Sequence, residues 1–256
     1  MFKSIAWIAP TAIGAIYALT PFAVHSSFCV AARCKLASIS VDRLPKQISE
    51  EFSRRISEFA VLGFELVGTF DCGVLTNDTH SYVACFCHHA TNEFANVTAM
   101  STPIGPASYF EFSSQFSNGR SIETNSNAVL PLMPVNPDIR IFRFESITEL
   151  RTLLQVHRQL AEKYAPGLCP LGEPRDAEVQ RYVRTVEAFG PRLVEAGYMR
   201  LGEGGDNFRL TWRGAIRMAW FRLWPVTLFR KAIHHHAMQL ELQSLQTRTE
   251  AALQKA

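Results

Sequence analysis

The densest group of potential metal ligands in the sequence is Cys85-Phe-Cys87-His88-His89, with four of them in five residues. On an extended strand, Cys85 and Cys87 project from the same face, as two thiolate ligands of a zinc ion would. A structural zinc ion takes four ligands, and the chain offers no second Cys/His pair of matching spacing. The pattern therefore favours small buried cysteines on a strand, and we predict neither a metal site nor a cofactor.

Residue types suited to hydrolysis are also present, but they form no recognisable motif. Ser113, Ser114, Asp71 and His80 could supply a nucleophile, an acid and a base. No GxSxG, HExxH or Walker loop and no paired-carboxylate signature accompanies them. His157 falls on an apolar helix face, where a core histidine bonded to the backbone is the commoner case. We predict no catalytic residue, and an enzyme is disfavoured.

The strongest local signal for binding is a segment in which three tryptophans and several aliphatic residues alternate with arginines. It contains five basic residues between 213 and 231 and no acidic one. Tryptophan prefers the headgroup region of a bilayer, and arginine can reach anionic headgroups. A core helix with paired arginines is an equally good interpretation. The residues predicted to contact a membrane surface are Trp212, Arg213, Arg217, Trp220, Arg222, Trp224, Arg230 and Lys231.

Residues 195–214 resemble the wing of winged-helix DNA-binding domains. Glu195-Ala-Gly-Tyr-Met-Arg-Leu leads into a glycine-rich loop, and Phe208-Arg-Leu-Thr-Trp-Arg-Gly214 follows it. The resemblance implies a nucleic-acid contact through this hairpin. The interruption predicted at Gly190-Pro191 falls where a recognition helix should be continuous, and the net charge of +3 is slight. A structural hairpin is therefore favoured, and nucleic acid is not expected as a partner.

The apolar run that must position these segments is residues 5–24, which contains no charged residue. Its length is about that of a helix crossing a hydrocarbon core of ~30 Å. We predict a transmembrane anchor in residues 1–28, with a cleaved signal peptide as the alternative. Arg33, Lys35 and Arg43 outnumber Lys3, so the positive-inside rule predicts a single-pass membrane protein with a cytoplasmic C-terminal domain. A secreted or periplasmic location is the alternative.

Residues 40–165 should form an α+β domain. Between about residues 64 and 144 the hydrophobic period is two, typical of five or six strands joined by hairpins and hence of an antiparallel sheet. Asn118-Gly119 predicts a tight type I′ turn. Amphipathic helices flank the sheet, and the later one opens with a capping box at Ser146 and Glu149. We expect both helices on one sheet face.

Residues 175–256 are predicted to be mainly helical, with the small β-hairpin and the Trp/Arg-rich helix. Together these features favour a membrane-anchored protein whose α+β domain binds a protein partner or ligand, or assembles as a homo-oligomer. The bilayer would contact residues 5–24, and an anionic lipid surface residues 212–231. Two alternatives remain: a membrane-tethered nucleic-acid binder, and an exported hydrolase released by signal cleavage.

Overall fold

The computed structural model describes the backbone of residues 2–33, 36–76, 79–102, 105–134, 136–172 and 175–253. Within these ranges the side chains of residues 2–12, 74–76, 102, 175–178, 181, 249 and 251–253 are not described. The helices are α1 (Phe2–Ser27), η1 (Val41–Arg43), α2 (Lys46–Val61), α3 (Leu150–Tyr164), α4 (Arg175–Glu195), α5 (Trp212–Arg222) and α6 (Val226–Leu253).

The strands form one continuous sheet in the order β8-β7-β6-β5-β4-β3-β1-β10-β9, with β2 paired to β3. Their bounds are β1 (Cys29–Ala31), β2 (Ala37–Ser38), β3 (Glu65–Thr76), β4 (Thr79–His88), β5 (Glu93–Thr102), β6 (Gly105–Gln115), β7 (Ser121–Asn125), β8 (Ile139–Arg143), β9 (Met199–Leu201) and β10 (Asn207–Leu210). A single residue pair, Val30 with Thr76, joins β1 to β3. The sheet therefore has a large part, β2 to β8, and a small part of β1, β10 and β9.

The prediction of a purely antiparallel sheet is wrong at one edge. β7 and β8 are parallel, with Ser121 opposite Ile139 and Asn125 opposite Arg143. The chain from residue 126 to 138 runs back along the sheet before β8 begins, so it is a crossover and not a hairpin. The alternating pattern predicted the strand, but it carries no information about the direction of the connection.

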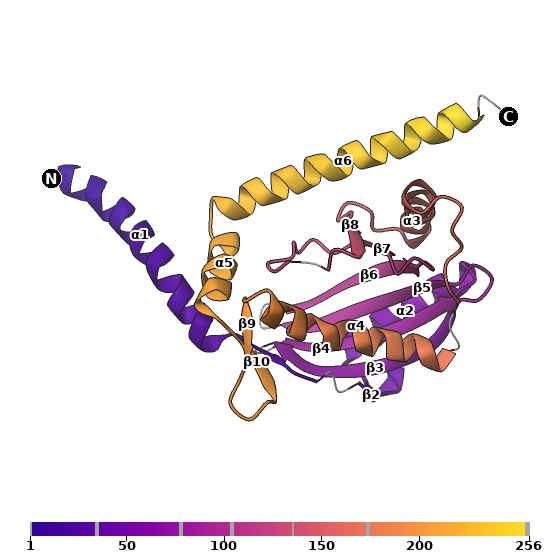
Figure 1. Cartoon of the computed structure of the whole chain (residues 1–256), viewed down its shortest axis with the longest axis horizontal. Helices are drawn as coiled ribbons and strands as arrows, with labels where there is room; N and C mark the ends of the chain where they lie inside the picture. Colours follow the sequence, from indigo (N-terminus) through magenta and orange to yellow (C-terminus); the bar gives the residue numbers. More distant parts are fainter. Residues whose placement is uncertain are drawn as a thin grey trace.

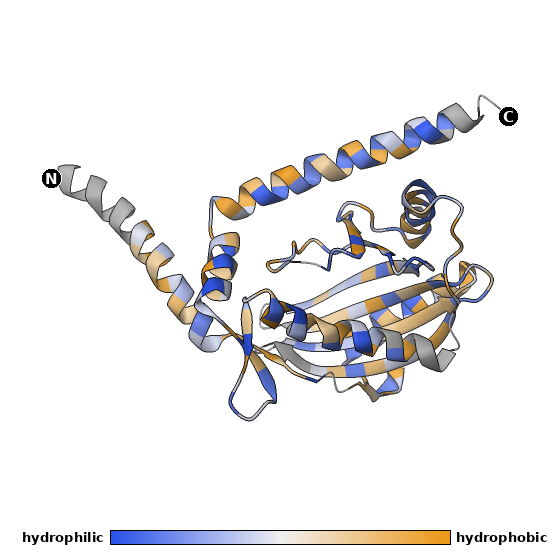
Figure 2. Ribbon diagram, in the orientation of Figure 1, coloured by the Kyte–Doolittle hydropathy of each residue, from blue (hydrophilic) through white to orange (hydrophobic). Residues whose placement is uncertain are grey.

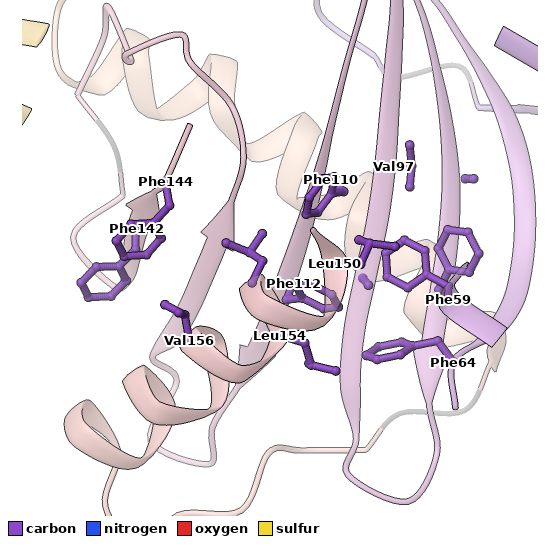
Figure 3. Close-up of a cluster of buried hydrophobic side chains, with 14 of the residues drawn as sticks. Phe59, Phe64, Val97, Phe110, Phe112, Phe142, Phe144, Leu150, Leu154 and Val156 are labelled. Carbon is purple, nitrogen blue, oxygen red and sulfur yellow. The ribbon is translucent and has the colours of Figure 1, made fainter. Parts of the chain in front are cut away.

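The main hydrophobic core lies between the sheet and the pair α2 and α3 (Figure 3). Phe52 and Phe59 of α2 are fully buried, as are Leu153 and Leu160 of α3. They pack against the residues of β4, β5 and β6 that point to this face, with Phe112 fully buried near the centre. Several ring contacts join these aromatic side chains, including the stacked pair Phe59 and Phe86 at 4.3 Å.

The expectation that the two helices flanking the sheet share one face is confirmed, since α2 and α3 pack in the same core, but a further helix, α4, covers part of the other face. Figure 1 shows α4 lying across the sheet on the side opposite α2. Tyr182 of α4 packs against a second cluster formed by Cys72, Val83, Cys85 and Phe94. Because side chains alternate between the faces of a strand, β4 presents Ala84 and Phe86 to one core and Val83 and Cys85 to the other. Both faces of β4 are therefore buried, which explains why its sequence is a nearly continuous apolar run.

The small part of the sheet has a core of its own, built with α4 and α5. Leu193, Met199, Phe208, Leu210 and Met218 are buried in it. α4 runs unbroken through Pro191, contrary to the interruption predicted there. A Cβ atom on Gly190 would lie 2.1 Å from Cε2 of Phe208, so glycine permits the close approach of the helix and β10.

Two local predictions also need correction. The hairpin between β6 and β7 exists, but only Gly119 adopts a positive φ, of 79°, so the turn is not of type I′. The N–H of Gly119 donates to the carbonyl of Phe116, and Phe116 and Arg120 bond across the turn. The capping box is absent as well, because Glu149 takes the N-cap position of α3 and makes no side-chain cap bond.

The predicted transmembrane anchor is contradicted. Across the part of the chain that the structure describes, no helix has both the length and the apolar character that a membrane span requires. The first residues of the predicted span, 5–12, lie outside the described side chains. The described remainder of α1 packs on α5, where the ring of Phe22 meets Trp212 edge-on at 4.8 Å and His25 stacks on the same indole at 4.2 Å. The predictions of a single-pass topology and of a membrane localisation, which both depended on the anchor, are therefore wrong as well.

Candidate functional site

A row of polar side chains crosses the sheet on the face that α4 partly covers. Asn96, Glu111 and Asn125 are direct neighbours on β5, β6 and β7, and Arg143 follows on β8. The amide of Asn96 donates to Oε1 of Glu111 at 3.1 Å, and the amide of Asn125 donates to Oε2 at 2.9 Å. Both oxygens of one carboxylate are thus held by donors from the two flanking strands.

Glu111 is the acid of this row, and burial changes the pKa of its carboxyl group. Burial raises the pKa of its carboxyl above the usual value, whereas the hydrogen bonds from Asn125 and Asn96 and the charge of Arg143 act to lower it. The next row on this face, two residue pairs along, contains Tyr109 and Thr98, whose side chains are hydrogen-bonded. Burial raises the pKa of Tyr109 to about 12, and the nearby charge of Glu111 adds to this effect. Its hydroxyl therefore stays protonated at neutral pH.

On the other side of the Glu111 row, the same sheet face opens into a cavity of about 340 Å³ below α4. This size falls within the range of small-molecule sites. The strands contribute Ser113, Gln115, Ser121, Glu123 and Ile139, the loops Gly119, Asn136 and Asp138, and α4 contributes Arg184, Thr185, Ala188 and Arg192. We call this cavity the α4 groove.

The two walls of the α4 groove carry different chemistry. On α4, Arg184, Ala188 and Arg192 are spaced four residues apart, so they share one helix face and present two guanidinium groups. The opposite wall presents the carboxyl groups of Glu123 and Asp138. Hydroxyl and amide groups lie between these charges. The groove can thus bind an anionic group at one wall and hydrogen-bond donors at the other.

The chain after α3 closes one end of this region. The N–H of Leu171 donates to the carbonyl of Gln115 at 2.8 Å, and Pro170 forms an isolated bridge with Phe116. The side chain of Asn92 donates to the carbonyl of Pro170 at 3.2 Å. These contacts tie the segment that leads into α4 to the ends of β5 and β6. α4 is therefore held over the sheet from its N-terminal connection as well as from its packed face.

Sequence reasoning missed this site almost entirely. Asn96 was not among the predicted site residues, yet it is 4% exposed and its side-chain amide donates to Glu111. Glu111 stands between Phe110 and Phe112, and this alternation signals an acid on the face opposite the aromatic core. The spacing of Arg184 and Arg192 signals a basic helix face. Nothing local indicates that the two faces meet.

The residues predicted to be of catalytic type lie in other places. Oγ of Ser114 is 2.9 Å from Nε2 of His157, and Thr124 Oγ1 is 3.0 Å from the other ring nitrogen. All three side chains are sealed in the main core, so His157 is a core histidine, bonded to side-chain hydroxyls and not to the backbone. Burial lowers the pKa of His157 to about 4. Asp71 and His80 form a separate half-buried pair at 2.6 Å.

The cysteine and histidine residues near the end of β4 do not assemble a metal site among the described residues, where no group of three or more His, Cys, Asp or Glu is suitably placed. Cys85 is buried in the second cluster beneath α4. Sγ of Cys87 lies 3.3 Å from Nε2 of His89. His88 bonds Thr91 through Nδ1 at 2.9 Å and turns its ring toward Gly63.

The structure divides the eight residues predicted to contact a membrane surface into two sets. Arg217 and Arg230 turn inward: their guanidinium groups donate to the carbonyls of Leu132 and Pro131 and lie over the ring of Phe221. The other six are exposed, namely Trp212, Arg213, Trp220, Arg222, Trp224 and Lys231. This set lies on α5 and the start of α6, far along the chain from the residues of the α4 groove.

The glycine-rich hairpin that resembles a wing is β9 and β10. Met199, Phe208 and Leu210 are buried in the core that this hairpin forms with α4 and α5, and β10 also pairs with β1.

Comparison of the chain with protein-family models, with curated proteins and with solved structures gives no match in any of the three.

Proposed function

We propose that this chain is a ligand-binding module and that the α4 groove is its site. The observation that carries the proposal is a cavity of about 340 Å³ on the α4 face of the sheet, where polar side chains of β6 and β7 stand in place of the apolar residues of the neighbouring cluster. A fold gains little stability from polar groups at such positions, whereas a binding site requires them for specificity.

The charges of the α4 groove define the class of ligand. Arg192 and Arg184 favour a carboxylate or phosphate, because a guanidinium group can donate two hydrogen bonds to either. Glu123 and Asp138 favour hydroxyl or ammonium donors on the other side. The ligand is therefore a small polar molecule with an anionic group at one end and hydrogen-bond donors at the other.

The hydrogen-bonded position of Glu111 supports the same role. A carboxyl held between Asn96 and Asn125 fixes the side chains of β5 to β7 in one arrangement. The adjacent positions Ser113 and Glu123 are then presented to the groove from a stiff surface, which reduces the entropy lost on binding. Glu111 is a positioning residue in this proposal and does not contact the ligand.

Thermal unfolding in the presence of glutamate, gluconate and glycerol phosphate tests this proposal. A ligand at concentration L that binds only the folded state stabilises it by RT ln(1 + L/Kd), so the melting temperature rises with the logarithm of the ligand concentration once that concentration exceeds Kd. Arg192→Ala should weaken binding by at least about tenfold, because it removes hydrogen bonds to a charged group. Arg200→Ala, an exposed arginine of β9, is the matched control and should bind as the wild type does.

The proposal fails if none of these probes, and no other small hydroxylated or zwitterionic anion, shifts the melting temperature. It also fails if isothermal titration shows equal affinity for Arg192→Ala and Arg200→Ala. The nucleic-acid and hydrolase alternatives stay as predictions. The same experiment distinguishes them from the ligand-binding proposal. A nucleic-acid binder would respond to a single-stranded oligonucleotide, and a hydrolase to a hydrolysable ester, and neither would respond to the small anions.

A further inference from the structure

Three helices that meet at one end of the molecule expose an unusual amount of apolar surface. α1 and α6 diverge there from α5 (Figure 1). Trp212, Ile216 and Trp220 of α5 are each about half exposed, at 47%, 46% and 54%. Spaced four residues apart, they form one stripe along the helix. Exposed apolar patches of this kind on a folded domain mark interaction surfaces.

Neighbouring elements extend this stripe on both sides. On α1, Leu19 and Phe22 are 64% and 60% exposed, and Phe22 touches Trp212. Just after α5, Trp224 is 65% exposed, and Phe229 and Ile233 follow on one face of α6 at 66% and 70%. Apolar residues recur along the first turns of α6 in Figure 2.

Basic residues alternate with these apolar residues in the sequence, and Arg213, Arg222 and Lys231 are exposed. Arg213 follows Trp212, Arg222 stands between Trp220 and Trp224, and Lys231 stands between Phe229 and Ile233, where it lines a small pocket together with Glu145. Residues 212–231 contain no Asp or Glu, and neither do residues 13–27. We call this combination of exposed aromatic, aliphatic and basic side chains on α1, α5 and the start of α6 the aromatic-basic surface.

Arg217 and Arg230 support the aromatic-basic surface from behind. Their guanidinium groups lie 4.5 and 4.1 Å from the ring centroid of Phe221 and bond to backbone carbonyls of residues 131 and 132. They therefore hold the junction of α5 and α6 against the loop between β7 and β8. The other three, Arg213, Arg222 and Lys231, are exposed, and the guanidinium group of Arg213 lies over the ring of Tyr198 at 4.6 Å.

The charge of the surface restricts what can cover it. A second copy of the chain, placed face to face, would bring the exposed arginines of one α5 against those of the other, and residues 212–231 supply no acid to neutralise them. An anionic lipid surface supplies the opposite charge, and its headgroup layer is where tryptophan side chains partition best. We propose that the aromatic-basic surface binds the headgroup region of bilayers that contain anionic phospholipid. This contact needs no helix that crosses the bilayer, because side chains inserted to headgroup depth suffice.

Flotation of the full-length protein with vesicles tests the proposal. Two compositions are compared: phosphatidylcholine alone, and equimolar phosphatidylcholine and phosphatidylserine. The wild type should float with the mixed vesicles and much less with phosphatidylcholine alone. Added salt should reduce the binding, since exposed charges are screened.

Two matched pairs of variants locate the contact. The double substitution Arg222→Gln with Lys231→Gln should weaken binding to mixed vesicles by about 25-fold, at about fivefold for each charge removed. Arg151→Gln, an exposed arginine of α3, should have no effect. Trp220→Ala should weaken binding by about tenfold, since an inserted aromatic side chain is lost. Leu201→Ala, at the same 54% exposure on β9, should bind as the wild type does.

The proposal is overturned if the wild type does not float with mixed vesicles, if it floats equally with phosphatidylcholine alone, or if both variants bind as their controls do. Sedimentation equilibrium without vesicles gives a further outcome. A wild-type dimer that Trp220→Ala dissociates would mean that a second copy covers the surface, and the lipid proposal would then be wrong. Circular dichroism of each variant confirms that it is folded. None of these results depends on the α4 groove.

Discussion

The two faces of the large sheet are made by alternate residues of the same strands, yet they differ in almost every physical property. The face toward α2 and α3 is packed with Phe52, Phe59, Phe86 and Phe112, all within 1% of complete burial. The face toward α4 is apolar only beneath part of α4 and becomes polar across β5, β6 and β7. The first face buries more apolar surface and so contributes more to the stability of the fold, whereas the second carries the polar groups on which the proposed function rests.

Polar groups also exist on the packed face, but there they bond to one another and are closed off from solvent. Ser114, Thr124 and His157 form this network. On the α4 side, the row of Glu111 borders an open cavity. A closed network adds specificity to the packing of a core, whereas a network beside a cavity can hold ligand-facing side chains in place.

The largest expected difference between the faces comes from adjacent residues of β6. Phe112→Ala should lower the free energy of unfolding by about 3–5 kcal/mol, because it removes a fully buried ring and leaves a cavity. Glu111→Gln, one residue earlier on the opposite face, should change it by less than about 1 kcal/mol at the pH where Glu111 is protonated. Urea unfolding of both variants measures this. Equal losses would show that the polar row is as essential to the fold as the aromatic core.

The second difference concerns acid stability and arises on the packed face. Burial holds the folded pKa of His157 at about 4, below the unfolded value of 6.5. The unfolded chain therefore binds this proton first, and stability is lost as the pH falls from 6.5 through 4. The loss should be about 3 kcal/mol. In His157→Gln this part of the pH dependence should disappear, whereas in His235→Gln, an exposed histidine of α6, it should remain.

Denaturation series at successive pH values distinguish the two variants. Parallel curves for the wild type and His157→Gln would mean that His157 has the same pKa in the folded and unfolded chains. The sealed Ser114–His157–Thr124 network would then be incorrect.

The smallest expected effect is on the polar face and has the opposite sign. Burial raises the folded pKa of Glu111 above the ordinary 4.5, so the stability that its protonated form contributes is complete below pH 4.5. That contribution is lost as the pH rises through the folded pKa. Relative to the wild type, Glu111→Gln should therefore become more stable as the pH increases. Unfolding at pH 4.5 and at mildly alkaline pH measures the change, and a relative loss of stability at alkaline pH would contradict it.

Local patterns were sufficient to predict much of the secondary structure. The period of two located β3 to β8, because alternation along a strand is a property of consecutive residues. The amphipathic helix predicted before the sheet corresponds to α2 (Lys46–Val61), and Gly63, with a φ of 85°, follows its end. The parallel pairing of β7 and β8 could not be predicted in this way, since residues 126–138 contain no periodic element that shows which way the chain returns.

The candidate sites show the same division. Composition and spacing identified the Trp/Arg-rich segment as a surface of interest, and the structure then separated the outward Arg222 from the inward Arg217 and Arg230. The α4 groove was not predictable, because Glu123 and Arg192 are far apart in the chain and meet only where α4 crosses the sheet. The apolar run of residues 5–24 led to the wrong prediction of an anchor. Hydropathy sums the side chains of consecutive residues and takes no account of tertiary contacts such as that between Phe22 and Trp212.

The sequence by itself therefore determined the elements and the alternation of apolar and polar residues on each strand. Both depend on interactions between residues a few positions apart. The tertiary structure alone decided that α4 covers the second sheet face, that β8 joins in parallel, and that Phe22 and His25 of α1 meet Trp212 of α5. These contacts join residues that are distant in the chain. Burial of apolar surface favours them, and it depends on the area removed from water and not on how far apart the residues are in the sequence.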